Sequence, residues 1–344
     1  MSASASHAKR SGAATRPSRA RVDFHLSGSS VVSAPGGQVP GTTDELASAT
    51  GYALAEKSEN TRRAYRADMK AFSAWCERAG RRALPACAET CAVYFAALAD
   101  AGLKVSTIQR RAAAIAYAHR LAGQASPIGV EGVKAVLRGI SRTVGVAVAG
   151  KAPLTADLVA RVVRRLPDTL AGKRDRALIV LGFAAALRRS ELVGLGFGDV
   201  SRNGDGVFLH IRRSKTDQDG RGDEIAVPSG AKLKPVEALD AWLEASGIVS
   251  GALFRAVDRH ERLCGPLRDR AAAEIVKRAA SRAKLDPARF SGHSLRAGFV
   301  TSALGAGADL FRVMDVTRHR RVETLRIYDR RAKAFKDHAG RRFL

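Results

Sequence analysis

Cysteine and long apolar runs are both scarce in this sequence of 344 residues. Its four cysteines are Cys76, Cys87, Cys91 and Cys264. Cys87 and Cys91 are the closest pair, but a zinc site would also need a second cysteine pair or a histidine doublet nearby, and the sequence has neither. We therefore interpret all four as reduced thiols rather than as a disulfide framework or metal ligands. No apolar run reaches the roughly 18 residues that a membrane span requires. Residues 1–20 also lack the apolar stretch of a signal peptide.

Acidic residues are scarce relative to basic ones. The chain contains 58 Lys and Arg residues against 33 Asp and Glu, which gives a formal net charge of +25 at pH 7. Only a few of these charges lie in the N-terminal tail, so the folded part carries most of the excess. A positive field of this size favours a polyanion. Nucleic acid is the first candidate, an acidic membrane surface is a weaker one, and a solvated basic surface is the alternative.

The composition divides the chain into four parts. Residues 1–42 are rich in Ser, Ala, Gly and Pro and cannot bury enough apolar surface to become ordered, so we expect a disordered basic arm. Residues 43–143 have the pattern of helices joined by short loops, which predicts a small helical bundle that binds DNA. Residues 144–154 are small and unpatterned, as is typical of a linker. Residues 155–344 are expected to form a catalytic domain with a C-terminal helix.

The helix predicted over residues 104–123 has one apolar face and one basic face. Ile108, Ala112 and Ile115 recur at helical spacing and are expected in the core. The opposite face suits a helix that lies in a DNA groove, and a merely solvated basic face is the alternative. The candidate DNA-binding residues of this domain are Arg62, Arg66, Ser106, Thr107, Arg110 and Arg111.

The second domain is predicted to be mainly helical around a small antiparallel sheet. Two strands, within residues 206–214 and 223–229, flank a polar connection. Helices are predicted within residues 155–166, 173–187, 235–246, 268–284, 293–307, 310–316 and 323–338. The fold class is therefore mainly α, an N-terminal helical bundle plus an α+β domain. The candidate DNA-binding residues here are Arg255, Arg259, Arg262, Arg268 and Arg289. We expect most of the candidates in both domains to contact phosphate rather than bases.

Two segments of the second domain offer groups suited to phosphodiester chemistry. Cleavage by a side chain needs a nucleophile, a proton donor and cations that neutralise the transition state. Arginine suits the last role because its planar fork binds two phosphate oxygens and keeps its charge. Arg188 and Glu191 are three residues apart, as are His293 and Arg296, so on a helix each pair shares a face. Spacing alone does not separate Arg188 from the adjacent Arg189.

A third segment places one tyrosine among arginines. Tyr328 follows His319 by nine residues, and on one continuous helix the two would lie roughly 13 Å apart on opposite sides. For both to reach one phosphate, the chain must turn after His319 and begin a new helix near Arg321 or Val322. Nearby cations would favour the phenolate of Tyr328, whose ordinary pKa is about 10.

These segments resemble the tyrosine recombinase (integrase) family, which includes Cre and the Xer recombinases. The resemblance is carried by Arg-x-Ser-Glu-Leu at 188–192, by His-x-x-Arg at 293–296, and by His319 with Thr324 and then Tyr328 after it. The turn "RRSKTDQDG" offers Lys215 where the family has an essential lysine between strands. In the first domain, "TRRAYRADMKAFSAWC" and "GLKVSTIQRR" are similar to the core-binding half of Cre-like proteins. The resemblance covers roughly residues 43–344.

The resemblance implies how the reaction is divided among these residues. Tyr328 would attack a scissile phosphate and form a 3′-phosphotyrosyl link. Arg188 and Arg296 would clamp the nonbridging oxygens, and Lys215 would protonate the 5′-oxygen leaving group. The covalent link conserves bond energy, so neither ATP nor any other cofactor is expected, and no metal, because arginines neutralise the charge.

The resemblance also implies supporting roles and partners. His293 would act in proton transfer around the nucleophile, His319 would hydrogen-bond the phosphate, and Glu191 would orient its neighbours. The expected partner is double-stranded DNA with a specific recombination site. A homotetramer would form on that DNA and pass through a Holliday junction, from a monomer or weak oligomer when free. No membrane partner is expected, and the place of action would be the cytoplasm, at the nucleoid.

The sequence departs from the family pattern beside the key residues. Ala186 stands where the family commonly has glycine before the Leu-Arg of the first motif. Thr317 and Arg318 replace the Leu-Gly that often precedes the third-motif histidine, and the triplet after Arg296 is 297–299, Ala-Gly-Phe. None of these changes removes a catalytic side chain. Two rival functions stay open at this point, a type IB topoisomerase-like enzyme that relaxes DNA and a DNA-binding protein that has lost catalysis.

Overall fold

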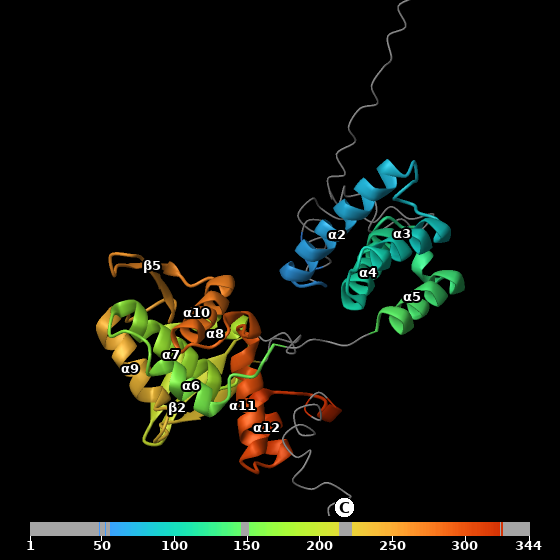
Figure 1. Cartoon of the computed structure of the whole chain (residues 1–344). Helices are drawn as coiled ribbons and strands as arrows, with labels where there is room; N and C mark the ends of the chain where they lie inside the picture. The colour runs from blue at the N-terminus through green and yellow to red at the C-terminus, as the bar shows by residue number, and fades with distance from the viewer. Residues whose placement is uncertain are drawn as a thin grey trace, which may run out of the picture. The chain divides into compact units, whose positions relative to one another are not determined.

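The computed structural model describes residues 56–145, 151–212 and 222–323, together with Ser48, Tyr52 and Leu325. The chain falls into two compact units, residues 1–148 and 149–344, and each is described by itself (Figure 1). The predicted arm, residues 1–42, and residues 146–150 of the predicted linker lie outside the described residues. The domain limits set from composition stay predictions.

The first unit is the helical bundle that the sequence predicts. Its helices are α2 (Glu59–Arg78), α3 (Ala88–Asp100), α4 (Val105–Leu121) and α5 (Glu131–Val144), with a 3-10 turn at Pro127–Gly129 before α5. Ser58 begins α2, because its hydroxyl accepts a hydrogen bond from the backbone N–H of Thr61. Met69 and Phe72 on α2 are buried against Tyr94 of α3 and its neighbours. On α4, the residues expected in the core are buried as predicted.

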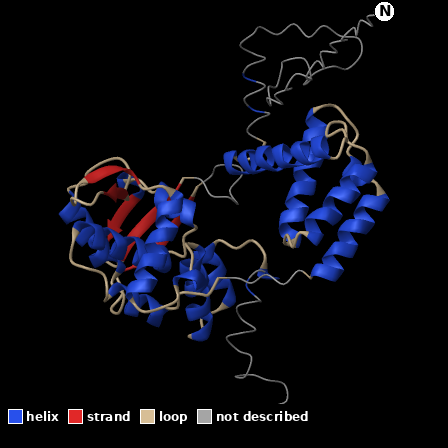
Figure 2. Ribbon diagram, turned by 45° about the horizontal axis from the view of Figure 1, so that its top comes forward, coloured by secondary structure: helices blue, strands red, loops and turns tan. Residues whose placement is uncertain are grey.

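The second unit packs helices around a small antiparallel sheet (Figure 2). Its helices are α6 (Ala156–Val163), α7 (Leu170–Ala184), α8 (Arg189–Gly194), α9 (Pro235–Ser246), α10 (Asp269–Arg282), α11 (His293–Gly305) and α12 (Leu310–Thr317), with 3-10 turns at Phe197–Asp199 and Pro287–Arg289. Its strands are β1 (Val200–Asn203), β2 (Gly206–Ile211), β3 (Asp223–Pro228), β4 (Arg255–Val257) and β5 (Leu263–Pro266). The predicted fold class is confirmed.

Helix α7 is the centre of the second core. Leu178 and Leu181 are fully buried on it, and the helix packs against α9 and α11. Trp242 of α9 is also fully buried, and its indole N–H donates to the carbonyl oxygen of Leu253 at 2.9 Å, so its one polar atom is satisfied. This core fixes the C-terminal end of α7 beside α11, where the candidate site lies.

The sheets contain more strands than predicted. β2 is the middle strand of a three-stranded sheet, paired antiparallel with β1 and with β3, and β4 pairs with β5 in a separate hairpin. The sequence pattern predicts β2 and β3 but not the other three strands. β1, β4 and β5 have three or four residues each and no alternation of buried and exposed positions, so they carry no period-two signal.

Candidate functional site

The start of α8 builds the first part of the site. Glu191 lies in the first turn of this helix, where its Oε2 accepts the backbone N–H of Arg188 at 2.9 Å and its Oε1 accepts the Arg188 guanidinium at 2.7 Å. The Glu191 side chain is only 2% exposed. The sequence spacing placed Arg188 on this helix together with Glu191. In the structure, Arg188 lies one residue before the helix begins. The expected contact with Glu191 nevertheless forms, because a carboxylate at this position reaches back to the residue before the helix.

The structure separates the two adjacent arginines of the first motif. Arg189 donates from Nε and Nη2 to the two carboxylate oxygens of Asp269 on α10, each at 2.6 Å. This bidentate pair ties α8 to α10 and commits Arg189 to a structural contact. Arg188 instead lies close enough to His293 and His319 for its charge to lower the pKa of both. The packing therefore favours Arg188 as the functional residue.

Arg296 of α11 joins the three motif segments. The residue is only 2% exposed, and its Nη1 donates to the carbonyl oxygen of Ala186, just after α7, at 2.8 Å. Its Nη2 donates to the carbonyl oxygen of Thr317 at the end of α12 and lies 3.4–3.5 Å from the two ring nitrogens of His319. One guanidinium thus brings together residues that are more than 100 positions apart in the sequence.

His319 sits in the turn that the sequence predicts. α12 ends at Thr317, Arg318 adopts a left-handed conformation with φ 56°, and helical backbone resumes at Val322. The Thr317 hydroxyl donates to the carbonyl oxygen of Val313 at 2.7 Å, so it accepts from Nδ1 of His319, also at 2.7 Å. In the neutral ring, Nδ1 therefore carries the proton and Nε2 keeps its lone pair.

Both histidines are held neutral at pH 7. Burial, together with the charges of Arg296 and Arg188, lowers the pKa of His319 from 6.5 to about 4. The same causes, in the same order, lower the pKa of His293 at the first position of α11. A cluster of permanent cations and neutral imidazoles is suited to bind an anion.

Glu191 has a second cationic partner that the sequence analysis named only as a departure. The Nη2 of Arg318 lies 2.6 Å from Glu191 Oε2, and its Nη1 lies 3.8 Å from Asp223 at the start of β3. Burial would raise the pKa of Glu191, but Arg318 and Arg188 outweigh it and hold this pKa below its ordinary value. No local pattern points to Arg318, because its partners are distant in sequence.

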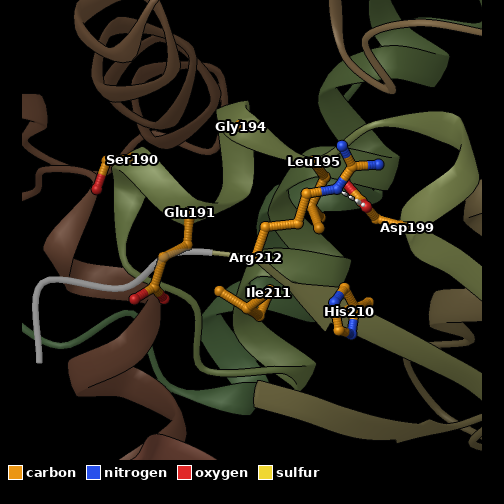
Figure 3. A pocket seen from close by; sticks show the side chains of 8 residues that line it. All are labelled: Ser190, Glu191, Gly194, Leu195, Asp199, His210, Ile211 and Arg212. Carbon is orange, nitrogen blue, oxygen red and sulfur yellow. Dashed lines mark hydrogen bonds and ion pairs between the residues drawn. The ribbon is translucent and has the colours of Figure 1, made fainter. Parts of the chain in front are cut away.

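A pocket of about 310 Å³ opens on the side of α8 that faces the sheet. Figure 3 shows Glu191 at this pocket together with Arg212, whose Nε donates to Asp199 at 2.6 Å. Arg212 begins the connection between β2 and β3. Lys215, the lysine expected in that connection, and Tyr328, the expected nucleophile, both lie outside the described residues.

The basic face predicted on α4 is partly neutralised. Asp68 of α2 is only 4% exposed, and both of its carboxylate oxygens accept from Arg110 at 2.9 Å. Arg111 lies 3.7 Å from the same carboxylate and donates to the Tyr94 hydroxyl at 2.8 Å. The sequence does not predict that Asp68 pairs with these arginines, because the spacing of residues within one helix carries no information about contacts with another helix.

The candidate DNA-binding residues differ in exposure. Arg66, Ser106, Arg110, Arg259, Arg262, Arg268 and Arg289 are exposed, whereas Arg62, Thr107, Arg111 and Arg255 are half-buried. Arg255 donates to the carbonyl oxygen of Cys264 at 2.7 Å and so braces the β4–β5 hairpin. Contact of these residues with DNA stays a prediction.

The described residues contain neither a candidate metal centre nor a candidate membrane-spanning helix. No group of three or more His, Cys, Asp or Glu side chains there could hold a metal ion. Over the same ranges, no helix combines the length and the apolar character that crossing a membrane requires.

Comparison with known proteins places this chain in a family. Residues 153–334 match the model of the phage integrase family, and residues 51–125 match the model of the phage integrase N-terminal SAM-like domain. An integrase/recombinase, a xerD homolog of Selenomonas ruminantium, is 38% identical over 290 residues, which cover 82% of this chain and 85% of that protein.

Two solved structures share the fold. The Tn1549 transposon integrase in complex with transposon right-end DNA matches with a TM-score of 0.58 and 15% identity over 84% of this chain and 97% of that one. A lambda integrase dimer bound to a COC′ core site matches with a TM-score of 0.55 and 18% identity over 79% and 72%. At these identities the likeness shows the fold alone, and the family assignment rests on the sequence matches. The chain belongs to the phage integrase family of tyrosine recombinases.

Proposed function

We propose that this chain is a site-specific DNA recombinase that cleaves and rejoins DNA through a 3′-phosphotyrosyl intermediate. The observation that carries the proposal is the convergence on Arg296, whose guanidinium contacts Ala186, Thr317 and His319 from the first and third motif segments. The relatives named recombinase or integrase support the same reaction. Family membership and this convergence are independent observations.

Arg188 and Arg296 would bind the nonbridging oxygens of the scissile phosphate. Asp269 pairs with the neighbouring Arg189 and leaves Arg188 free of that contact. Glu191 holds the Arg188 guanidinium from one side. Two permanent cations at one phosphate stabilise the charge that gathers on its oxygens in the transition state. No cofactor or metal is part of this proposal.

His319 would bind the phosphate only after it takes up a proton. Its neutral form keeps a lone pair on Nε2, which cannot donate to an anion. The negative charge of an arriving phosphate favours the imidazolium form of His319. The pKa of His319 therefore rises, and the protonated Nε2 becomes a hydrogen-bond donor. His293, neutral and beside both arginines, would accept and return the proton of the nucleophile.

The bond-breaking step balances with the groups named. The phenolate oxygen of Tyr328 attacks phosphorus, the bond from phosphorus to the 5′-oxygen breaks, and Lys215 gives that oxygen a proton. Attack by the 5′-hydroxyl of a second strand reverses these transfers and releases Tyr328. We further propose that four copies assemble on two DNA sites and exchange strands through a Holliday junction, in the cytoplasm at the nucleoid.

The test uses the purified protein and DNA that carries its own recombination site. We expect wild type to form a covalent protein–DNA adduct, visible on a denaturing gel, and Tyr328→Phe to bind this DNA equally well without forming it. A wild type that binds but forms no adduct would refute catalysis and leave a DNA-binding protein. Relaxation of a supercoiled plasmid that lacks the site would indicate a topoisomerase-like enzyme instead.

A further inference from the structure

Arg318 adopts a backbone conformation that suits glycine better. It caps the C-terminal end of α12 with φ 56° and ψ 42°, in the left-handed region that L-residues enter at a cost. This is the position where the resemblance places glycine. The chain keeps the turn that glycine would make and adds a long cationic side chain to it, of which only 10% is exposed. Such a side chain needs a reason in the surrounding contacts.

The contacts of Arg318 lead to Glu191 at the start of α8. Its Nη2 lies 2.6 Å from Glu191 Oε2, across 127 positions of sequence. The same carboxylate accepts from the backbone and the guanidinium of Arg188 at 2.9 and 2.7 Å. One buried carboxylate is therefore shared by two guanidinium groups, one on each of two motif segments. Among the described residues, Arg318 makes its other ion pair with Asp223 at 3.8 Å.

Charge balance shows what sharing does for Arg188. A buried pair of Arg188 and Glu191 alone would have no net charge, so its attraction for a phosphate would be small. With Arg318 added, the three side chains have a net charge of +1, and the carboxylate divides its attraction between two cations. Asp223, 3.8 Å from Arg318 and 39% exposed, is screened by solvent and offsets little of this charge. Arg188 is then held in place while much of its field stays directed at an incoming anion.

We propose that Arg318 is a positioning residue of the recombinase site, which acts through Glu191 to orient Arg188 and to preserve its charge toward the scissile phosphate. The proposal rests on the proposed function. Arg318 itself does not touch the reacting atoms. Because it directly precedes His319, the same contact also fixes the start of the turn that presents this histidine.

The experiment is a double-substitution cycle between Arg318 and Glu191. The variants are Arg318→Gly, Glu191→Gln and the pair, with Arg320→Gly as a matched control, since Arg320 is an exposed arginine in the same turn. The readout is the single-turnover rate of covalent adduct formation at saturating DNA. We expect Arg318→Gly to reduce this rate roughly ten- to hundredfold, which is the effect that a displaced catalytic group produces. Arg320→Gly should keep the wild-type rate.

The cycle separates positioning through Glu191 from other roles. In the Glu191→Gln background, the further loss from Arg318→Gly should be less than about threefold, because the shared carboxylate is already gone. Arg318→Lys should recover part of the rate, since it restores the charge. If the glycine variant unfolds, Arg318→Lys replaces it in the cycle: its loss should disappear in the Glu191→Gln background.

Two results overturn the proposal. Adduct formation at the wild-type rate in Arg318→Gly, or equal losses in both backgrounds, would show that Arg318 does not act through Glu191 while leaving the recombinase function intact. Absence of the adduct from wild type would instead refute the proposed function, and this inference with it.

Discussion

Gly298 on α11 offers a sharp test of how the fold positions the site. A Cβ atom at this position would lie 1.9 Å from the carbonyl oxygen of Leu154 and 2.4 Å from its carbonyl carbon. Leu154 is fully buried and donates its N–H to the carbonyl oxygen of Ser294 at 2.9 Å. The contact is therefore with backbone that is held by the same helix and cannot rotate away. Gly298→Ala should force α11 and residues 152–156 apart by about 1 Å.

The magnitude follows from this overlap. Overpacking against fixed backbone costs about 3 kcal/mol, which for a unit of this size lowers the melting temperature by roughly 6–12 °C. Arg296 lies on the same helix, so a shift of about 1 Å should also reduce adduct formation up to a hundredfold. Both effects should appear together in one variant.

Gly305, the last residue of α11, supplies the control. A Cβ there meets no atom within 4 Å, so Gly305→Ala should be neutral or stabilise the protein by up to about 1 kcal/mol. Melting is followed by fluorescence in a Trp75→Phe background, which leaves Trp242 of the second unit as the single tryptophan. Equal melting temperatures for the two alanine variants would refute the close approach of α11 to Leu154.

Three further predictions address charge. Asp68→Asn should destabilise the first unit by roughly 1–2 kcal/mol, because it removes the charged acceptor shared by the exposed Arg110 and the half-buried Arg111, as measured by urea unfolding followed at Trp75. Because the pKa of His319 falls from 6.5 to about 4 on folding, the unfolded chain binds more protons between these values. Stability is therefore lost as pH falls. Between pH 7 and pH 4.5, the free energy of unfolding of wild type should fall by about 1–2 kcal/mol more than that of His319→Gln, after discounting for partial exposure. Denaturant titrations at the two pH values measure this difference. Arg259→Ala and Arg262→Ala should each reduce the slope of log binding constant against log salt by about 0.9, and an unchanged slope would remove that arginine from the DNA contact.

The sequence predicted the helices well because their signals are local. Apolar residues at helical spacing mark α2 and α4, and the turn after His319 followed from the distance that two side chains must cover. The short strands β1, β4 and β5 have no such signal, and their hairpins form because neighbouring elements hold them. Local patterns therefore predicted the helices and two strands of the second unit but neither the edge strand β1 nor the hairpin of β4 and β5.

The choice between Arg188 and Arg189 shows where local reading ends. Arg188 directly precedes α8 and Arg189 is its first residue, and no spacing rule distinguishes them. Asp269 decides the matter from α10, 80 positions away, by engaging Arg189. Arg318 and Glu191 are further apart still. Charge pairing across a fold is a tertiary property, so a sequence can supply its members without indicating which of them will meet.

The departures at Ala186 and Arg318 have a common physical explanation. Both residues have positive φ, 47° and 56°, at positions where the family resemblance places glycine. Each of these left-handed conformations costs an L-residue about 1–2 kcal/mol. At each turn, a backbone carbonyl oxygen accepts a hydrogen bond from Arg296: that of Ala186 itself in the first turn, and that of Thr317, the residue before Arg318, in the second. Charge-assisted bonds to a buried guanidinium contribute about 1.5–3 kcal/mol each, enough to offset the strain. What the site requires of the backbone at these two turns is therefore a carbonyl group aimed at Arg296, and glycine is only one way to provide that backbone shape.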